Sequence, residues 1–201
     1  MRDKARIIGV LLAAGRGARF DPSGSRLKLL ERAARGPHIG EPLAVAAART
    51  LRAELPEVVA VVAPPSDTGQ AELHRLLRAE GCTLALNPRP AEGQGASIVC
   101  GIAAASHAAG WIIALADMPA IQADTIRRVV EALHGGAATA APVHRGQRGH
   151  PVGFAATMQA ELLASAGDTG ARAVLLRHPP RLIEVDDPGV LYDVDTFEDR
   201  R

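Results

Sequence analysis

A glycine-rich loop that carries several cations follows the first apolar run of the chain. Gly15 and Gly17 allow the backbone to approach a phosphate closely, and their amides can donate hydrogen bonds to its oxygens. Arg19 and Lys28 add cationic groups suited to a triphosphate. The loop lacks the third glycine of the dinucleotide fingerprint and the Gly-Lys-Ser/Thr of a P-loop. It therefore predicts a phosphate site of another kind, with an ordinary turn bearing solvated arginines as the alternative.

Two aspartates are candidate metal ligands. Asp117 directly follows an apolar run, and Mg²⁺ binds one or two carboxylates together with phosphate oxygens and water. A turn or helix cap is the alternative role for Asp117. Asp195 lies beside Val194, and a short strand there would bring Asp195 to the edge of the sheet where Asp117 lies. The alternative is that Asp195 caps a final helix that begins at Thr196. Two carboxylates that meet there repel each other unless a cation or proton intervenes, so the pair predicts a Mg²⁺ site.

Short apolar runs alternate with amphipathic segments along the chain. Buried strands are expected at residues 7–13, 58–63 and 111–116, a short strand at 83–86, and a further strand at 137–143. Helices are expected at 42–55, after Asp67, at about 96–108, after Asp124, at 157–163 and at 169–177, with a loop near residues 144–150. This alternation implies right-handed βαβ units, so we expect an α/β, Rossmann-like three-layer fold with a mostly parallel central sheet. No repeat or linker interrupts residues 1–201, which are expected to form a single domain. In such sheets ligands bind at the carboxyl ends of the strands.

Composition narrows the classes of partner. The formal net charge of +1 gives no broad basic field for nucleic acid or an anionic membrane, and 2% aromatics provide few stacking platforms for single strands. No stretch approaches the ~20 apolar residues of a membrane span, and the basic N-terminus with its apolar run fits a buried strand better than a signal peptide. Cys82 and Cys100 have no metal-like spacing and are expected to be two buried thiols, with a disulfide as the alternative. We therefore expect a cytoplasmic protein, with a monomer favoured.

An opening motif and five later segments, taken in order, carry a resemblance to a known family. The opening motif reads Leu12-Ala13-Ala14-Gly15-Arg16-Gly17-Ala18-Arg19, with Lys28 beyond it. It resembles the nucleotidyltransferase family that includes the molybdenum cofactor cytidylyl- and guanylyltransferases. Later segments resemble that family's Gly-x-x-x-Ser loop, Asp-x-Pro motif, Gly-His-Pro segment and two late segments, at residues 92–97, 116–119, 148–151, 167–172 and 193–196.

The resemblance implies roles for individual residues. Nucleotide binding is expected at Leu12, Ala13, Ala14, Gly15, Gly17, Arg19, Lys28, Gly95 and Ser97, and acceptor binding at Gly149, His150 and Pro151. Catalytic roles fall on Arg19, Lys28 and Asp117, and Mg²⁺ on Asp117 and Asp195. One departure is that eight residues, 20–27, separate Arg19 from Lys28, whereas the family's lysine usually follows its arginine by about five; Arg26 is the substitute candidate. Taken alone, a lone histidine such as His150 is more often a structural hydrogen-bonding residue than a catalytic one.

The implied activity is transfer of a nucleoside monophosphate from an NTP to a phosphorylated acceptor, molybdopterin by resemblance, with release of pyrophosphate. The Leu-Ala-Ala-Gly form of the first motif is similar to that of the cytidylyl branch of the family. This similarity predicts CTP rather than GTP as the substrate. The alternatives are another phosphorylated acceptor, such as a sugar phosphate or phospholactate, and a nucleotide-binding module without turnover. A glycosyltransferase of the GT-A type is a further alternative, because Asp193 and Asp195 have the spacing of that class's metal motif.

Overall fold

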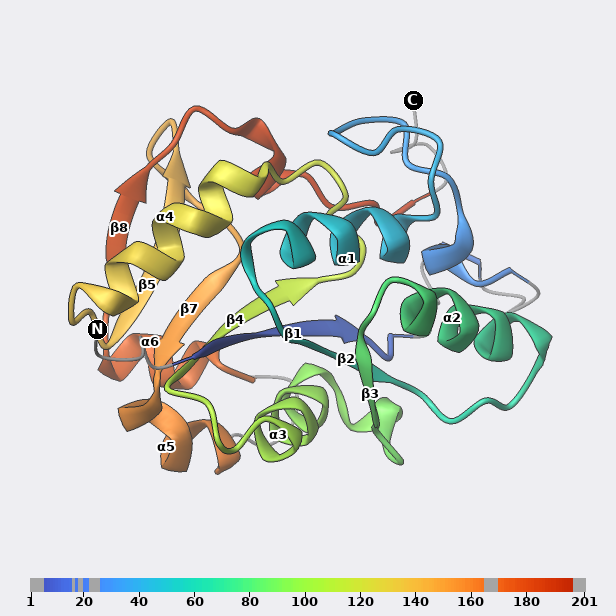
Figure 1. Ribbon diagram of the computed structural model, residues 1–201, viewed down its shortest axis with the longest axis horizontal. Coiled ribbons are helices and arrows are strands. Elements are labelled where there is room, and N and C mark those ends of the chain that lie inside the picture. Colours follow the sequence, from blue (N-terminus) through green and yellow to red (C-terminus); the bar gives the residue numbers. More distant parts are fainter. Residues whose placement is uncertain (1–5, 16, 18–19, 22–25, 165–169, 197–201) are drawn as a thin grey trace.

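The strands form one eight-stranded sheet within the described part of the chain (Figure 1). The computed structural model describes residues 6–15, 17, 20–21, 26–164 and 170–196. The strands are β1 (Ile7–Ala13), β2 (Val58–Val62), β3 (Thr83–Leu86), β4 (Gly110–Leu115), β5 (Thr139–His144), β6 (Gln147–Arg148), β7 (Val152–Ala155) and β8 (Arg181–Glu184). Their order is β3-β2-β1-β4-β7-β5-β6, with β8 paired to β5.

Most of the sheet is parallel, as the sequence predicts. β1 lies between β2 and β4, both parallel to it, and β3 extends this parallel set. β7 runs antiparallel to both β4 and β5, and β6 runs antiparallel to β5. The expectation of a loop near residues 144–150 was therefore wrong at β6, and β7 was not anticipated. Both strands are short, and the turn between β5 and β6 is rich in arginine and glycine, so they carry little periodic signal.

Helices cover both faces of the sheet. One face carries α1 (Leu43–Glu54), α2 (Thr68–Ala79) and α4 (Ala123–His134), and the other carries α3 (Gln94–Ala104), α5 (Gln159–Leu163) and α6 (Arg172–Arg177) (Figure 1). The expected three-layer α/β fold is confirmed. None of the described helices is both long and apolar enough to cross a membrane.

Alternation along β1 explains the two apolar layers. Ile7 and Leu11 belong to the cluster under α1, α2 and α4, whereas Ile8 and Val10 belong to the cluster over α3, α5 and α6. A strand with both faces covered reads as a continuous apolar run, since successive side chains point to opposite faces. Burying each large aliphatic side chain stabilises the fold by roughly 1.5–3 kcal/mol.

Helix ends follow local chemistry. The side chain of Asp67 accepts a hydrogen bond from the Gln70 amide at 2.8 Å, which confirms its role as the cap of α2. α3 begins two residues earlier than expected and ends four residues sooner. Gly93 precedes it with φ of +88°, so the chain turns sharply into the helix there.

The C-terminal segment is tied to the start of α4 by a buried carboxylate. Asp187 accepts hydrogen bonds from the Gln122 amide at 2.9 Å and the Thr125 hydroxyl at 2.7 Å, at the start of α4. It also caps the 3₁₀ helix η5 (Pro188–Leu191) through the Gly189 amide at 2.9 Å. This anchoring fixes where the last described residues, which include Asp195, can lie.

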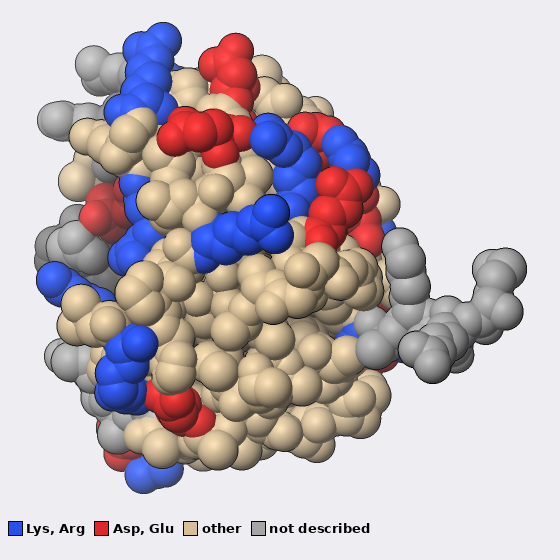
Figure 2. Space-filling model, turned by 90° about the vertical axis from the view of Figure 1, so that its left-hand side faces the viewer, with Lys and Arg blue, Asp and Glu red and all other residues tan. Residues whose placement is uncertain are grey.

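On one face of the molecule (Figure 2), acidic and basic side chains are mixed rather than gathered by sign. Figure 2 shows one face of the molecule with acidic and basic side chains interspersed and a broad area that has no charged side chain. This face offers no continuous basic surface of the kind that tracks a nucleic-acid backbone.

Candidate functional site

An ion-pair cluster lies at the carboxyl ends of β1 and β4. The Lys28 ammonium Nζ donates a hydrogen bond to Oδ2 of Asp117 at 2.6 Å and lies 3.7 Å from Oδ1 of Asp195. Lys28 opens the 3₁₀ helix η1 (Lys28–Leu30) and is 8% exposed, so its charge is largely withdrawn from water. Three residues that the sequence singled out separately therefore meet at one point.

A backbone contact next to Asp195 holds it at this edge. The Val194 amide donates to the carbonyl oxygen of Asp117 at 3.0 Å, outside any regular strand. This places Asp195 at the expected edge without the short strand that the sequence suggested. The alternative helix start at Thr196 lies at the limit of the described residues.

The glycine loop has the geometry of a ligand cradle at two positions. Gly17 has φ of +63°, and a Cβ there would lie 3.0 Å from Cβ of Lys28, so a larger residue would press on the lysine. A Cβ on Gly15 would meet no atom of the described residues within 4 Å, so those residues leave this side of the backbone uncovered. Arg19 lies outside the described residues.

Arg26 does not take the place of Lys28 in the ion-pair cluster. Its guanidinium pairs with Glu31 at 3.0 Å, and its backbone amide donates to Asp21 at 2.8 Å. Its side chain is about half exposed. Lys28, despite the longer insertion, is the cation that reaches the two aspartates.

The Ser97 loop is held by a residue that the sequence reasoning missed. Asn87, buried after β3, donates from Nδ2 to the Ser97 hydroxyl at 3.0 Å and accepts from the Arg89 amide at 2.9 Å. A polar residue directly after a strand was the signal that could have identified it. Ser97 and Gly95 are both buried in the first turns of α3.

The remaining nucleotide-binding candidates lie on β1 and just beyond it. Leu12 and Ala13 belong to the strand. Ala14 is 2% exposed and its methyl group packs in the cluster over α3. Its side chain therefore faces the core, and Gly15 is the residue beside open space.

The Gly149–Pro151 segment packs against η5. The His150 amide donates to the Val190 carbonyl oxygen at 3.0 Å, and a Cβ on Gly149 would come within 2.2 Å of that oxygen, so only glycine fits. The His150–Pro151 peptide bond is cis. The buried Nδ1 of His150 has no hydrogen-bond partner among the residues that the structure describes. Burial lowers the pKa of His150, and the field of Asp117 opposes this effect.

Carboxylates at the cluster repel one another. Burial, with repulsion from Asp195 and Asp117, raises the pKa of Asp193. The Lys28 ammonium already lies within 4 Å of the other two carboxylates. A position that accommodates one cation between hard oxygen donors fits a divalent cation as well. The described residues contain no group of three or more His, Cys, Asp and Glu side chains arranged to hold a metal, so other oxygens would have to complete the coordination.

The two cysteines are both free thiols. Cys82 is buried, which raises the pKa of its thiol to about 11. Cys100 is only partly buried, and its thiol lies 3.2 Å from the Leu86 carbonyl oxygen. The expectation of two buried thiols thus holds for Cys82 and was wrong for Cys100, which lies at the edge of the sheet beside β3.

Known proteins resemble this chain over nearly its whole length. The family model for the MobA-like NTP transferase domain matches residues 9–182. The nicotine blue oxidoreductase of Paenarthrobacter nicotinovorans is 30% identical over 203 residues, covering 96% of this chain and 93% of that protein.

Solved structures share the fold. Rv0371c from Mycobacterium tuberculosis has a TM-score of 0.78 at 25% identity, covering 97% of this chain and 95% of that one. Its complex with manganese gives a TM-score of 0.75 at 23% identity, over 96% and 95% of the two chains. The molybdopterin-guanine dinucleotide biosynthesis protein A from Archaeoglobus fulgidus gives 0.68 at 17% identity, over 96% and 95%.

Proposed function

Because the chain belongs to the family of MobA-like NTP transferase domains, we propose that it transfers a nucleoside monophosphate from an NTP to a phosphorylated small molecule. The observation that carries this proposal is the convergence of Lys28, Asp117 and Asp195 beside the open backbone of Gly15. A buried ammonium and two carboxylates next to a glycine loop suit a triphosphate better than an uncharged ligand.

The reaction exchanges one phosphorus–oxygen bond for another. A phosphate oxygen of the acceptor attacks the α-phosphorus of the NTP, the bond from that phosphorus to the bridging oxygen breaks, and pyrophosphate leaves. Such transfers depend mainly on positioning and on neutralising charge, so no histidine base is required. In this proposal the Gly15–Gly17 backbone, Arg19 and Lys28 bind the triphosphate, and Lys28 exchanges its carboxylate partners for phosphate oxygens. Ser97, held by Asn87, supports the nucleoside.

The carboxylates have a second role in the proposal. A divalent cation held by Asp117 and Asp195, Mg²⁺ in our proposal, would neutralise charge at the α-phosphate. The manganese complex of Rv0371c supports the use of a divalent metal.

The finer substrate assignment rests on resemblance. The Leu-Ala-Ala-Gly form of the first motif favours CTP over GTP. Molybdopterin is the proposed acceptor, bound near Gly149, His150 and Pro151, and the likeness to the A. fulgidus protein in fold is compatible with it. Sugar phosphates and phospholactate remain acceptors to be compared.

A relative with a different activity supplies a second candidate function. The 30% identical protein from P. nicotinovorans is named an oxidoreductase. The first loop argues against hydride transfer from a dinucleotide. Phe20 stands where the dinucleotide motif G-x-G-x-x-G has its third glycine. In the proposed nucleotidyl transfer Lys28 and the two aspartates bind phosphate and metal, whereas hydride transfer gives these three residues no role.

The deciding experiment measures pyrophosphate release from each NTP, with and without each acceptor, in parallel with oxidation of NADH and NADPH. Nucleotidyl transfer predicts pyrophosphate only when both an NTP and an acceptor are present. Tight NTP binding without pyrophosphate release from any pair would favour a binding module. Oxidation of a reduced dinucleotide without NTP consumption would favour the oxidoreductase.

A further inference from the structure

A small apolar cluster, which we call the Phe20 cluster, lies apart from the two large layers of the core. Its buried members, with Tyr192 packed against them, are Phe20, Ala33, Leu43, Ala46 and Val194. Phe20 follows the glycine loop, Ala33 follows η1, which Lys28 opens, and Val194 directly precedes Asp195. The glycine loop, the Lys28 segment and the Asp195 segment thus each contribute a side chain to one small core.

Phe20 is bound to the glycine loop by the backbone. The amides of Phe20 and Asp21 donate to the Gly17 carbonyl oxygen at 2.8 and 3.1 Å, which makes a tight turn after Gly17. A Cβ on Gly17 would lie 3.8 Å from Cβ of Phe20 and 3.0 Å from Cβ of Lys28, so the Gly17 backbone packs between these two side chains. The Phe20 side chain is buried. A shift of the Gly17 backbone would therefore pull the ring out of its cluster and expose apolar surface.

The same cluster fixes the position of Asp195. The side chain of Val194 is 1% exposed, and its amide donates to the Asp117 carbonyl oxygen at 3.0 Å. The next residue, Asp195, has its carboxylate 3.7 Å from the Lys28 ammonium. Because interiors are close-packed, the buried Val194 side chain cannot move without its neighbours. The packing of Val194 thus sets where the Asp195 carboxylate lies.

The remaining members make this cluster rigid. Leu43 and Ala46 are fully buried on α1, which forms its base. The Ala33 amide donates to the Glu41 carbonyl oxygen, and the Gly40 amide donates to the Ala33 carbonyl oxygen, both at 2.8 Å.

A second contact joins the same two segments. The Arg35 guanidinium lies 5.2 Å from the centre of the Tyr192 ring. In Figure 1 the segment that follows η1, drawn in blue, lies beside the last part of the described chain. The segments that follow Lys28 and precede Asp195 are therefore held together at two points.

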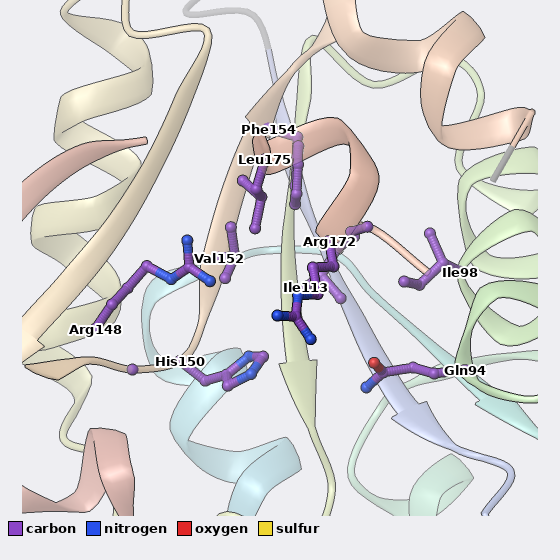
Figure 3. Close-up of a pocket in the computed structure, with 11 residues that line it drawn as sticks. Gln94, Ile98, Ile113, Arg148, His150, Val152, Phe154, Arg172 and Leu175 are labelled. Carbon is purple, nitrogen blue, oxygen red and sulfur yellow. The ribbon is translucent and has the colours of Figure 1, made fainter. Parts of the chain in front are cut away.

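The other described phenylalanine has a different setting. Phe154 is fully buried in the large cluster over α3 and lines a cavity together with Arg148, His150 and Arg172 (Figure 3). No member of the Phe20 cluster lines that cavity or belongs to either large layer. Phe154 fills the main core, whereas Phe20 joins mobile parts of the site to α1.

We infer that Phe20 is a positioning residue, which holds the glycine loop and Asp195 in one fixed relation without touching either ligand. It acts on the triphosphate through Gly17 and on the metal through Val194. Removing the ring should therefore weaken two different ligands at once. The inference rests on the proposed function for the identity of these ligands, whereas the link between Phe20 and Val194 is a property of the free protein.

The first test uses the free protein and measures hydrogen exchange of the Val194 amide by NMR. Phe20→Ala should speed this exchange by ~10-fold or more, because the contact with the Asp117 carbonyl oxygen opens more readily when the cluster loses its ring. Phe20→Leu fills most of the space and should stay close to the wild type.

A control variant separates this local effect from a general loss of stability. Leu77 is fully buried on α2 and belongs to the large cluster of the other layer. Leu77→Ala should lower the melting temperature clearly, since it leaves a cavity. It should not change Val194 exchange, because an amide near the end of the described chain exchanges by local opening rather than by global unfolding.

The second test measures CTP binding without metal and Mn²⁺ binding without nucleotide. Phe20→Ala should weaken each by ~10-fold, a modest part of what small misplacements of binding groups can cost, and Phe20→Leu should restore most of both. Asp195→Asn should weaken Mn²⁺ binding and leave CTP binding at least as tight. In the double variant the loss of Mn²⁺ affinity should be smaller than the two single losses combined, because Phe20 acts on the metal through Asp195.

Three results would overturn the inference. They are unchanged Val194 exchange in Phe20→Ala, equal changes in Leu77→Ala, and wild-type affinity of Phe20→Ala for both CTP and Mn²⁺. Fully additive losses in the double variant would also reject the route through Asp195. Failure of the proposed function has another signature: the wild type itself binds neither CTP nor Mn²⁺, while Val194 exchange still responds to Phe20→Ala.

Discussion

The ammonium of Lys28 lies 2.6 Å from the Asp117 carboxylate and joins the segment after β1 to the end of β4. Asp195 approaches the same ammonium at 3.7 Å. In the free protein the position between the two carboxylates is therefore occupied by the protein's own cation. Substrate phosphates and a divalent cation would each compete for one side of this cluster.

Lys28 is expected to be needed for turnover. Lys28→Ala should lower kcat/KM by ~10²-fold or more, the scale lost when one preorganised charge donor is removed. Lys28→Arg should keep only part of the wild-type kcat/KM, because a planar guanidinium does not replace a compact ammonium at this position. Steady-state pyrophosphate release measures both variants. Arg26→Ala is the control and should remain near wild type; the reverse pattern would assign the role to Arg26.

Metal affinity is expected to depend on both aspartates. Asp117→Asn and Asp195→Asn should each weaken Mn²⁺ binding, measured by titration with paramagnetic detection, and leave the fold intact. Lys28→Gln should strengthen Mn²⁺ binding in the absence of nucleotide, because it removes the competing ammonium. If Asp195→Asn instead lowers the melting temperature and spares both metal binding and turnover, Asp195 is a helix cap.

The buried Asp187 offers a contrast to these variants. Its carboxylate accepts from the Gln122 amide, the Thr125 hydroxyl and the Gly189 amide, so Asp187→Ala should reduce the free energy of unfolding by roughly 1–3 kcal/mol, the cost of unpaired buried donors. It should change Mn²⁺ affinity less than Asp195→Asn does. Urea unfolding and the Mn²⁺ titration, made on the same preparations, compare the two roles.

Nucleotide preference is expected to favour CTP. The ratio of kcat/KM for CTP to that for GTP should exceed one, and Ala14→Gly should move it toward GTP if the backbone beside Gly15 sets the room for the base. Ala14 packs in the core, so its effect must pass through the backbone, and the melting temperature should fall slightly. A wild-type preference for GTP would overturn the assignment to the cytidylyl branch.

Stability is expected to fall in mild acid because of His150. Burial lowers the pKa of His150 in the folded protein, while the unfolded chain takes up its proton at the ordinary value of about 6.5. The contribution of neutral His150 to the free energy of unfolding is therefore fully present above pH 6.5, the ordinary value. It is lost as the pH falls from 6.5 through the lowered pKa of the folded protein. Urea midpoints between pH 8 and pH 5 should decline less in His150→Asn. The exposed His107, changed to Asn, should leave the decline unchanged; equal slopes in all three proteins would contradict the assignment.

Much of the fold was predictable because its signals are local. β1, β2, β4 and β5 are buried runs of mainly apolar residues, and the Asp67 side chain caps the helix that directly follows it. β6 and β7 were missed because two- and four-residue strands depend on pairing with distant neighbours rather than on periodicity. Asp195 is held beside Asp117 by long-range contacts, among them the Val194 amide on the Asp117 carbonyl oxygen, which the sequence does not encode locally.

The site was predictable in part for the same reason. Lys28 and Asp117 follow strands and carry charge, so their chemistry was visible at the sequence level. Asn87 acts only through Ser97, a contact between two segments. Arg148 and Arg172 come together only because β6 and α6 border one cavity, which no sequence spacing reveals.

The central claim is tested most directly by mass spectrometry of products formed from CTP labelled at the α-phosphate, incubated with the protein, Mg²⁺ and molybdopterin or a cell extract as the acceptor source. The account predicts a new product in which the labelled CMP is joined to the acceptor through a second phosphate, with one pyrophosphate released for each. Lys28→Ala should form little of it. Absence of any CMP-bearing product with every acceptor, or oxidation of NADH or NADPH by the protein with the labelled CTP unchanged, would contradict the account.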